Sequence, residues 1–106
     1  MPSNVFDLDD EIFDKKIKEG AALVDFWADW CMPCRFIGPI VEQLSEEYTG
    51  KINFYRLNVD KNREVASRFN ILGIPTLIFF KDGNELDRIV GVQPMENIKE
   101  KLDTMI

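Results

Sequence analysis

The chain has 106 residues, of which 45% are hydrophobic, and this size favours one domain (residues 1–106) with a single core. Its 13 basic and 19 acidic residues give a net charge of −6, which argues against nucleic acid or an anionic membrane as a partner. No apolar stretch reaches the ~20 residues that span a membrane, and the acidic first twenty residues lack the apolar core of an export signal. We therefore expect a cytoplasmic protein in a reducing compartment.

Three elements are predicted before the first cysteine. Residues 4–6 form a short edge strand, and Asp9 or Asp10 then caps a short helix that Gly20 ends. The core-facing residues of this helix are Ile12, Phe13 and Ile17. Residues 22–28 are short and mostly apolar, which predicts a buried strand.

A long helix is predicted over residues 33–48. Pro33 suits the first turn of a helix, where its missing N–H has no intrahelical partner. Pro39 should kink the helix one turn after the cysteines. The apolar residues that recur at helical spacing are Phe36, Ile37, Ile40, Val41 and Leu44.

The second half of the chain continues with strands and helices. Residues 51–59 alternate strongly enough to predict a strand, which a right-handed crossover places parallel to the first buried strand. The apolar residues of a short helix that follows are Val65, Ala66 and Phe69. Residues 76–80 and 86–90 flank a turn over 81–85 and predict a hairpin, which makes the sheet mixed.

Pro94 is predicted to open a final helix with one apolar face. The residues of this face are Met95, Ile98, Leu102 and Met105. We interpret the stripe as core packing, and a surface for a partner is the alternative.

Both cysteines of the chain, Cys31 and Cys34, lie where the buried strand passes into the long helix. Unpaired N–H groups and the positive end of the helix dipole stabilise an anion there, so Cys31 should ionise more readily than a free cysteine. A separation of three residues brings the two Cβ atoms to roughly 5–6 Å, from which small adjustments permit a disulfide. The pair therefore indicates a redox switch.

Two other uses of a Cys-x-x-Cys pair are open. A zinc or iron–sulfur site is the first, but zinc prefers four ligands and the chain has no third cysteine and no histidine. An inert structural disulfide is the second, and a reducing compartment disfavours it. We favour redox chemistry over both.

Three blocks of sequence resemble the thioredoxin family: Val-Asp-Phe-Trp-Ala at 24–28, Trp-Cys-Met-Pro-Cys at 30–34 and Gly-Ile-Pro-Thr at 73–76. The resemblance extends from about residue 6 to about residue 102, and it departs from the family at Met32, where glycine is usual. It implies an α/β thioredoxin fold, with a central mixed β-sheet flanked by helices on both faces. The order of the strands is implied by the family alone.

The resemblance also implies a function. Thioredoxins are protein-disulfide reductases: they carry a dithiol that reduces disulfides in target proteins through a mixed disulfide, and a thioredoxin reductase recycles them. We accordingly expect a monomer with no cofactor other than the redox-active disulfide, here Cys31–Cys34.

The same resemblance assigns roles at the site. Cys31 is the exposed nucleophile and Cys34 the resolving thiol. Asp25, an acid in the buried strand, assists proton transfer at the inner thiol, and a raised pKa would suit this task. The alternative for Asp25 is a structural acid turned toward solvent. Arg56 stands where the family often has lysine, and it keeps the positive charge but cannot share a proton.

The implied substrate-binding surface surrounds the cysteines. Pro75 should have a cis peptide bond and face the cysteines, which leaves the backbone of Ile74 free to pair with an extended substrate. An ordinary edge-strand proline is the alternative. Trp30 supports this surface, whereas Trp27 is assigned to packing. The predicted substrate-binding residues are Trp30, Met32, Pro33, Ile74, Pro75 and Gly91.

Two other classes of function are open. A thioredoxin-fold oxidase or isomerase would favour a charged residue or histidine between the cysteines and an export signal, and the sequence has neither. A binding subunit could use the same surface without redox turnover, although it would not need both cysteines.

Overall fold

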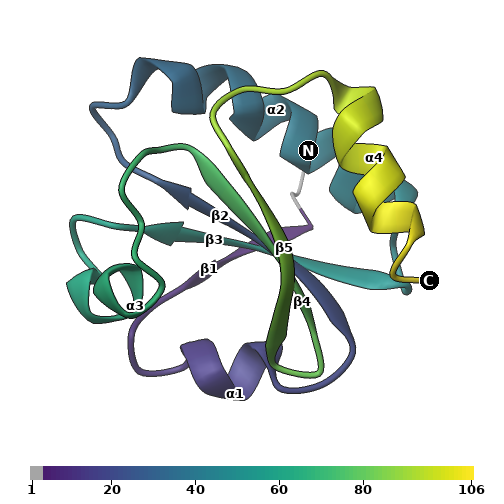
Figure 1. Ribbon diagram of the computed structural model, residues 1–106, viewed down its shortest axis with the longest axis horizontal. Coiled ribbons are helices and arrows are strands. Elements are labelled where there is room, and N and C mark those ends of the chain that lie inside the picture. Colours follow the sequence, from purple (N-terminus) through teal and green to yellow (C-terminus); the bar gives the residue numbers. More distant parts are fainter. Residues whose placement is uncertain (1–3) are drawn as a thin grey trace.

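The computed structural model describes residues 4–106, which contain five strands and four helices (Figure 1). In chain order they are β1 (Val5–Leu8), α1 (Phe13–Ile17), β2 (Ala21–Trp27), α2 (Met32–Glu47), β3 (Ile52–Asn58), α3 (Arg63–Arg68), β4 (Thr76–Lys81), β5 (Asn84–Val90) and α4 (Met95–Asp103). Every predicted element is present, with small shifts in its bounds.

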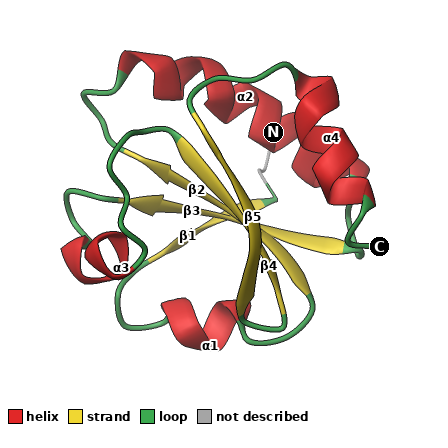
Figure 2. Cartoon of the chain, in the orientation of Figure 1, coloured by secondary structure: helices red, strands yellow, loops and turns green. Residues whose placement is uncertain are grey.

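The strands form one mixed sheet in the order β1-β3-β2-β4-β5. Strand β3 runs parallel to both β1 and β2, whereas β4 runs antiparallel to β2 and β5. Helices α2 and α4 cover one face of the sheet, and α1 and α3 cover the other (Figure 1, Figure 2). The expected α/β architecture is therefore confirmed.

Strand β2 is buried almost throughout because helices cover both faces of the sheet around it. Its side chains alternate between two cores: Leu23 packs on the side of α2 and α4, whereas Val24 and Phe26 pack on the side of α1 and α3. In the second core, contacting phenylalanine rings have centroids 5.4–6.5 Å apart in tilted or edge-on arrangements. These rings belong to Phe13, Phe26, Phe69 and Phe80.

The two longer helices each bury one stripe. In α4 and just after its end the buried residues are Ile98, Leu102 and Met105, which confirms their interpretation as core. The buried apolar residues along α2 include Ile37, Val41 and Leu44. Phe36 has the predicted helical spacing but is 65% exposed, so it lies outside the buried stripe. Successive helical residues are rotated by about 100°, which places Phe36 beside the buried stripe.

The two candidate helix caps have different partners. The Oδ1 atom of Asp9 accepts a hydrogen bond from the N–H of Ile12, just before α1, at 2.9 Å. Asp10 instead accepts the N–H of Val65, in the first turn of α3, at 3.0 Å. The N-cap of α1 is Ile12 and no side chain within residues 4–106 caps this helix, so Asp9 or Asp10 as its cap is wrong. The Asp10 carboxylate lies beside α3 and satisfies an unpaired N–H there.

Strands β4 and β5 are joined by a tight turn at Asp82 and Gly83, whose φ angles are 49° and 86°. A type I′ turn needs positive φ at both central residues, and glycine adopts it without a steric penalty. The predicted hairpin is confirmed, with a connection shorter than residues 81–85.

Candidate active site

The two cysteines lie at the junction of the β2–α2 link and the first turn of α2. Cys31 is the N-cap of the helix in extended backbone (φ −82°, ψ 106°), and Pro33 lies in the first turn as predicted. Cys31 forms a disulfide with Cys34 across a Cα–Cα distance of 5.3 Å. The Cys31 Sγ also accepts a hydrogen bond from the N–H of Cys34 at 3.2 Å. This N–H and the helix N-terminus favour a thiolate at Cys31.

Both cysteines are buried in the disulfide form, with 2% of Cys31 and 6% of Cys34 exposed. They form a small cluster with Ala28, and the side chains packed against this cluster are Trp27, Val59 and Ile74. The expectation that Cys31 is the exposed member of the pair is therefore wrong in this state, because neighbouring apolar residues cover it. A redox partner has to contact this cluster to reach either sulfur.

The loop from α3 to β4 brings Ile74 and Pro75 to the cysteines. The Ile74–Pro75 peptide bond is cis, as expected, and Ile74 packs against the cysteine cluster. The N–H of Gly91 donates to the carbonyl of Pro75 at 2.8 Å, which holds the end of β5 beside this loop. Within residues 4–106 the backbone of Ile74 makes no hydrogen bond, so its polar groups are available to an extended peptide.

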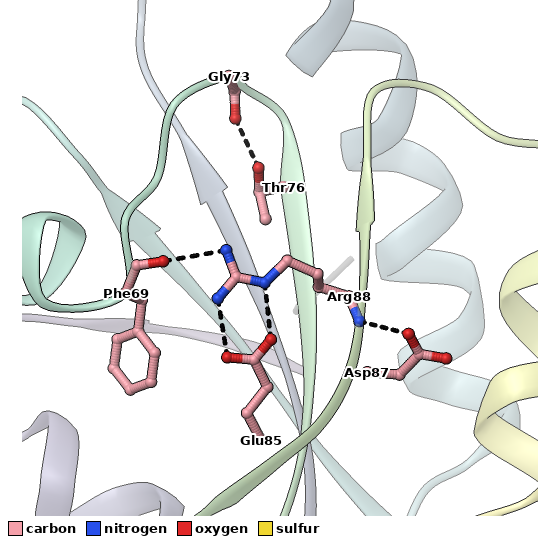
Figure 3. A network of polar contacts seen from close by, with 6 residues as sticks. All are labelled: Phe69, Gly73, Thr76, Glu85, Asp87 and Arg88. Atoms are coloured by element: carbon pink, nitrogen blue, oxygen red, sulfur yellow. Dashed lines mark hydrogen bonds and ion pairs between the residues drawn. The ribbon is translucent and has the colours of Figure 1, made fainter.

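Arg88 of β5 anchors the start of the same loop (Figure 3). Its Nη1 donates to the carbonyl of Phe69, at the end of α3, at 3.0 Å. Its Nε and Nη2 donate to the two carboxylate oxygens of Glu85 at 2.6 and 2.8 Å. Farther along, the hydroxyl of Thr76 donates to the carbonyl of Gly73 at 2.5 Å. These bonds fix the two ends of the segment that carries Ile74 and Pro75.

Asp25 lies in the middle of β2 and is 5% exposed. Among the described residues, no group donates a hydrogen bond to its Oδ1 atom. Burial raises the pKa of Asp25 to about 7, and the positive charge of Arg56 opposes this shift only in part. A structural acid turned toward solvent is therefore the wrong interpretation of Asp25.

A cavity of about 390 Å³ joins Asp25 to Cys34, and Cys31 is not part of its lining. The charged residues around it are Asp25, Asp29, Arg35, Glu42 and Arg56. A polar space of this size has room for water molecules. The cavity therefore gives water access to both the Asp25 carboxyl and the Cys34 side chain.

Arg56 neighbours Asp25 in the sheet but pairs with another acid. Asp7, Arg56 and Asp25 lie in register across β1, β3 and β2. The Arg56 Nε is 3.3 Å from Asp7 Oδ1, and its Cζ lies 3.9 Å from the centroid of the Trp27 ring. The guanidinium is thus held between Asp7 and Trp27, which leaves the Asp25 carboxyl without a direct ion pair.

The predicted surface residues gather around the cysteines. Trp30 is 70% and Met32 62% exposed, and Pro33 is also exposed. The Trp30 Nε1 donates to Asp60 Oδ2 at 2.7 Å, which links the ring to the loop after β3. Sequence reasoning missed Asp60, although its position just after a strand parallel to β2 was a usable signal, since parallel strands end at the same edge of a sheet.

Comparison with known proteins places this fold and site in a family. The family model described as Thioredoxin matches residues 4–104. The chain belongs to the thioredoxin family. A thioredoxin of Staphylococcus epidermidis is 50% identical to this thioredoxin-family chain over 94 residues, which are 89% of the chain and 90% of the relative. A thioredoxin of Staphylococcus aureus is 49% identical over the same shares. The crystal structure of Malassezia sympodialis thioredoxin (Mala s 13) matches with a TM-score of 0.87 at 31% identity, over 98% of this chain and 92% of that chain.

Membership of the thioredoxin family makes this protein a thiol–disulfide oxidoreductase with protein-disulfide reductase activity. Its redox group is the Cys31–Cys34 pair, and thioredoxins need no further cofactor. The partners that the family implies are disulfide-containing target proteins and a reductase. Between residues 4 and 106, no cluster of three His, Cys, Asp or Glu could hold a metal ion. In the same range no helix is long and apolar enough to cross a membrane.

Proposed function

We propose that Cys31 attacks the disulfide of a target protein and that Cys34 resolves the mixed disulfide. The unequal surroundings of the two sulfurs carry this proposal. Cys31 caps α2 and accepts the N–H of Cys34, which favours its thiolate. Cys34 lies inside the first turn and shares a cavity with Asp25, which suits a thiol that must lose a proton later.

The cycle then has two chemical steps. The Cys31 thiolate bonds to one sulfur of the target disulfide, the target S–S bond breaks, and the departing target thiolate takes a proton from water. Next, the Asp25 carboxylate accepts the Cys34 proton, the Cys34 thiolate attacks the Cys31 sulfur, and the bond between the Cys31 sulfur and the target sulfur breaks. The second target thiolate leaves and takes a proton from water, and Asp25 returns its proton to the solvent. The target gains two electrons and two protons, and this protein is left with the Cys31–Cys34 disulfide. A pKa of about 7 lets Asp25 accept and return a proton near neutral pH.

Target proteins would bind around the cysteines. The unpaired backbone groups of Ile74 support pairing with an extended segment, and exposed Trp30 offers apolar contact beside it. The proposed substrate-binding residues are Trp30, Met32, Pro33, Ile74, Pro75 and Gly91.

A thioredoxin reductase would return the disulfide to the dithiol, in a cytoplasm that keeps thiols reduced. Residues 1–106 would act as a single thioredoxin domain and as a monomer. The net charge of −6 supports protein partners over nucleic acid and anionic membranes.

The roles of the two cysteines are tested by trapping. Cys34→Ser should accumulate mixed disulfides with insulin, because nothing remains to release the target, whereas Cys31→Ser should trap none. The adducts are counted by mass spectrometry under denaturing, non-reducing conditions, with reduction of insulin by the wild type as the control. Equal trapping by both variants would overturn the assignment.

Met32 is expected to leave the couple reducing, since a neutral side chain adds no charge beside Cys31. Met32→Gly should move the reduction potential by at most about 20–30 mV, where 30 mV corresponds to about 1.4 kcal/mol for two electrons. Met32→His should raise the reduction potential by more than this amount, because an imidazolium stabilises the thiolate form. Each variant is equilibrated with a glutathione redox buffer. A wild-type potential close to that of a strong oxidant would favour the oxidase alternative.

A further inference from the structure

An apolar groove of about 750 Å³ lies along α2, and its lining begins at Met32, the residue after Cys31. One wall is formed by α2 residues and the other by the link between β5 and α4, which passes beside α2 (Figure 1). The described residues that line it are Met32, Pro33, Phe36, Ile40, Val92, Gln93 and Pro94, and none of them is charged. We call this the Phe36 groove.

Apolar side chains in both walls of the Phe36 groove are exposed to solvent. Phe36 is 65% exposed on one wall and Val92 46% on the other. Contiguous exposed apolar residues mark sites of interaction more often than scattered ones do. Met32 and Pro33, which begin the groove, lie between the two reacting cysteines. A target that presents its disulfide to Cys31 would therefore pass close to Met32 and Pro33, where the groove begins.

The distance along the groove sets which target residue can reach it. Phe36 is five residues after Cys31, and at about 1.5 Å per residue this is a rise of roughly 7–8 Å along α2. An extended segment covers that length in two to three residues at about 3.3 Å each. Without charged residues in the walls, a charged side chain entering the groove would lose its hydration and find no partner.

We propose that the Phe36 groove selects among targets by taking one aliphatic or aromatic side chain, two or three residues from the cysteine that Cys31 attacks. The occupant is an extended segment of the disulfide-containing target itself. This inference rests on the proposed role of Cys31 as the attacking thiol.

The test uses the reduced protein and a series of nine-residue peptides. Each has a central cysteine in a disulfide with a chromogenic thiol, flanks of glycine and serine, and one leucine moved through every other position. Leucine two or three residues from the cysteine, on one side, should raise the second-order rate constant about fivefold, the scale expected for partly burying one leucine. Aspartate at the same position should lower it.

Matched variants locate the effect. Phe36→Ala should abolish the leucine preference, and Phe36→Leu should retain it. Phe6→Ala is the control, because Phe6 on β1 is 63% exposed but does not line the groove, and its removal should leave the preference intact. A flat position profile, a preference that Phe36→Ala retains, or a loss in Phe6→Ala would each overturn the proposal.

Failure of the proposed function would look different. If Cys31 is not the attacking thiol, the Cys34→Ser variant should trap none of the peptides, whatever the position of leucine. That result overturns both proposals. Trapping of all the peptides at one rate overturns the groove alone.

Discussion

Asp25→Asn should raise the free energy of unfolding by up to about 4 kcal/mol at pH 8 and by less than about 1 kcal/mol at pH 4. Burial raises the pKa of Asp25 to about 7 in the folded protein, from an ordinary value of 3.8. Because the folded pKa is the higher one, ionisation opposes folding as pH rises from 3.8 to 7, and the cost is constant above 7. Asparagine stays neutral and removes this cost.

Urea denaturation at pH 4 and pH 8 measures both values. Glu11→Gln is the control, since it neutralises an exposed acid outside the cavity and should change neither value by more than about 0.5 kcal/mol. The Asp25→Asn variant should also turn over more slowly, by about tenfold or more, because the second step loses its proton acceptor. A loss of stability at pH 8 would show instead that Asp25 forms a favourable ion pair, for which Arg56 is the candidate.

Phe13→Ala should lower the free energy of unfolding by about 3–5 kcal/mol, the usual cost of removing a buried phenylalanine ring. Phe13 is fully buried and contacts Phe26, Phe69 and Phe80 with its ring. Its truncation leaves a cavity between α1, α3 and the sheet, which the rigid aromatic neighbours cannot close.

The matched control is Phe6→Ala, which removes the same ring from an exposed position and should cost about 0.5 kcal/mol or less. Both variants are compared by urea denaturation at one pH. A loss below about 1 kcal/mol for Phe13→Ala would mean that the core repacks around the gap, contrary to the tight ring contacts.

Local patterns in the sequence predicted the elements of this fold. Apolar periodicity predicted the core stripe of α4. Gly83 predicted the turn of the hairpin, and the antiparallel hairpin makes the sheet mixed. The order of the strands was implied by the family resemblance alone, because pairing partners leave no local mark. The exposure of Phe36 could not be predicted for a related reason: apolar character at a helical position does not say whether a neighbouring element covers it.

Some features of the candidate site could likewise be predicted from local sequence, and others could not. Cys31, Cys34 and Asp25 could be found because each occupies a chemically unusual position in its own element. The burial of Cys31 could not be predicted, since residues from three other segments cover it. The pairing of Arg56 with Asp7 depends on the register of β1 against β3, which the sequence does not specify.

Helix α3 has six residues, too few to be stable in water by itself. The carboxylate of Asp10, 55 residues earlier, accepts a hydrogen bond from an N–H in the first turn of α3. Arg88, 19 residues later, donates a hydrogen bond to the carbonyl that follows the last turn of α3. Each of these contacts closes a long loop of the chain and therefore costs conformational entropy. This entropy is part of the cost of ordering the segment that presents Ile74 to a target. Amide exchange in α3 should accordingly report the opening of these two anchors, and this local opening can loosen the target-binding loop while β2 and its neighbours stay paired.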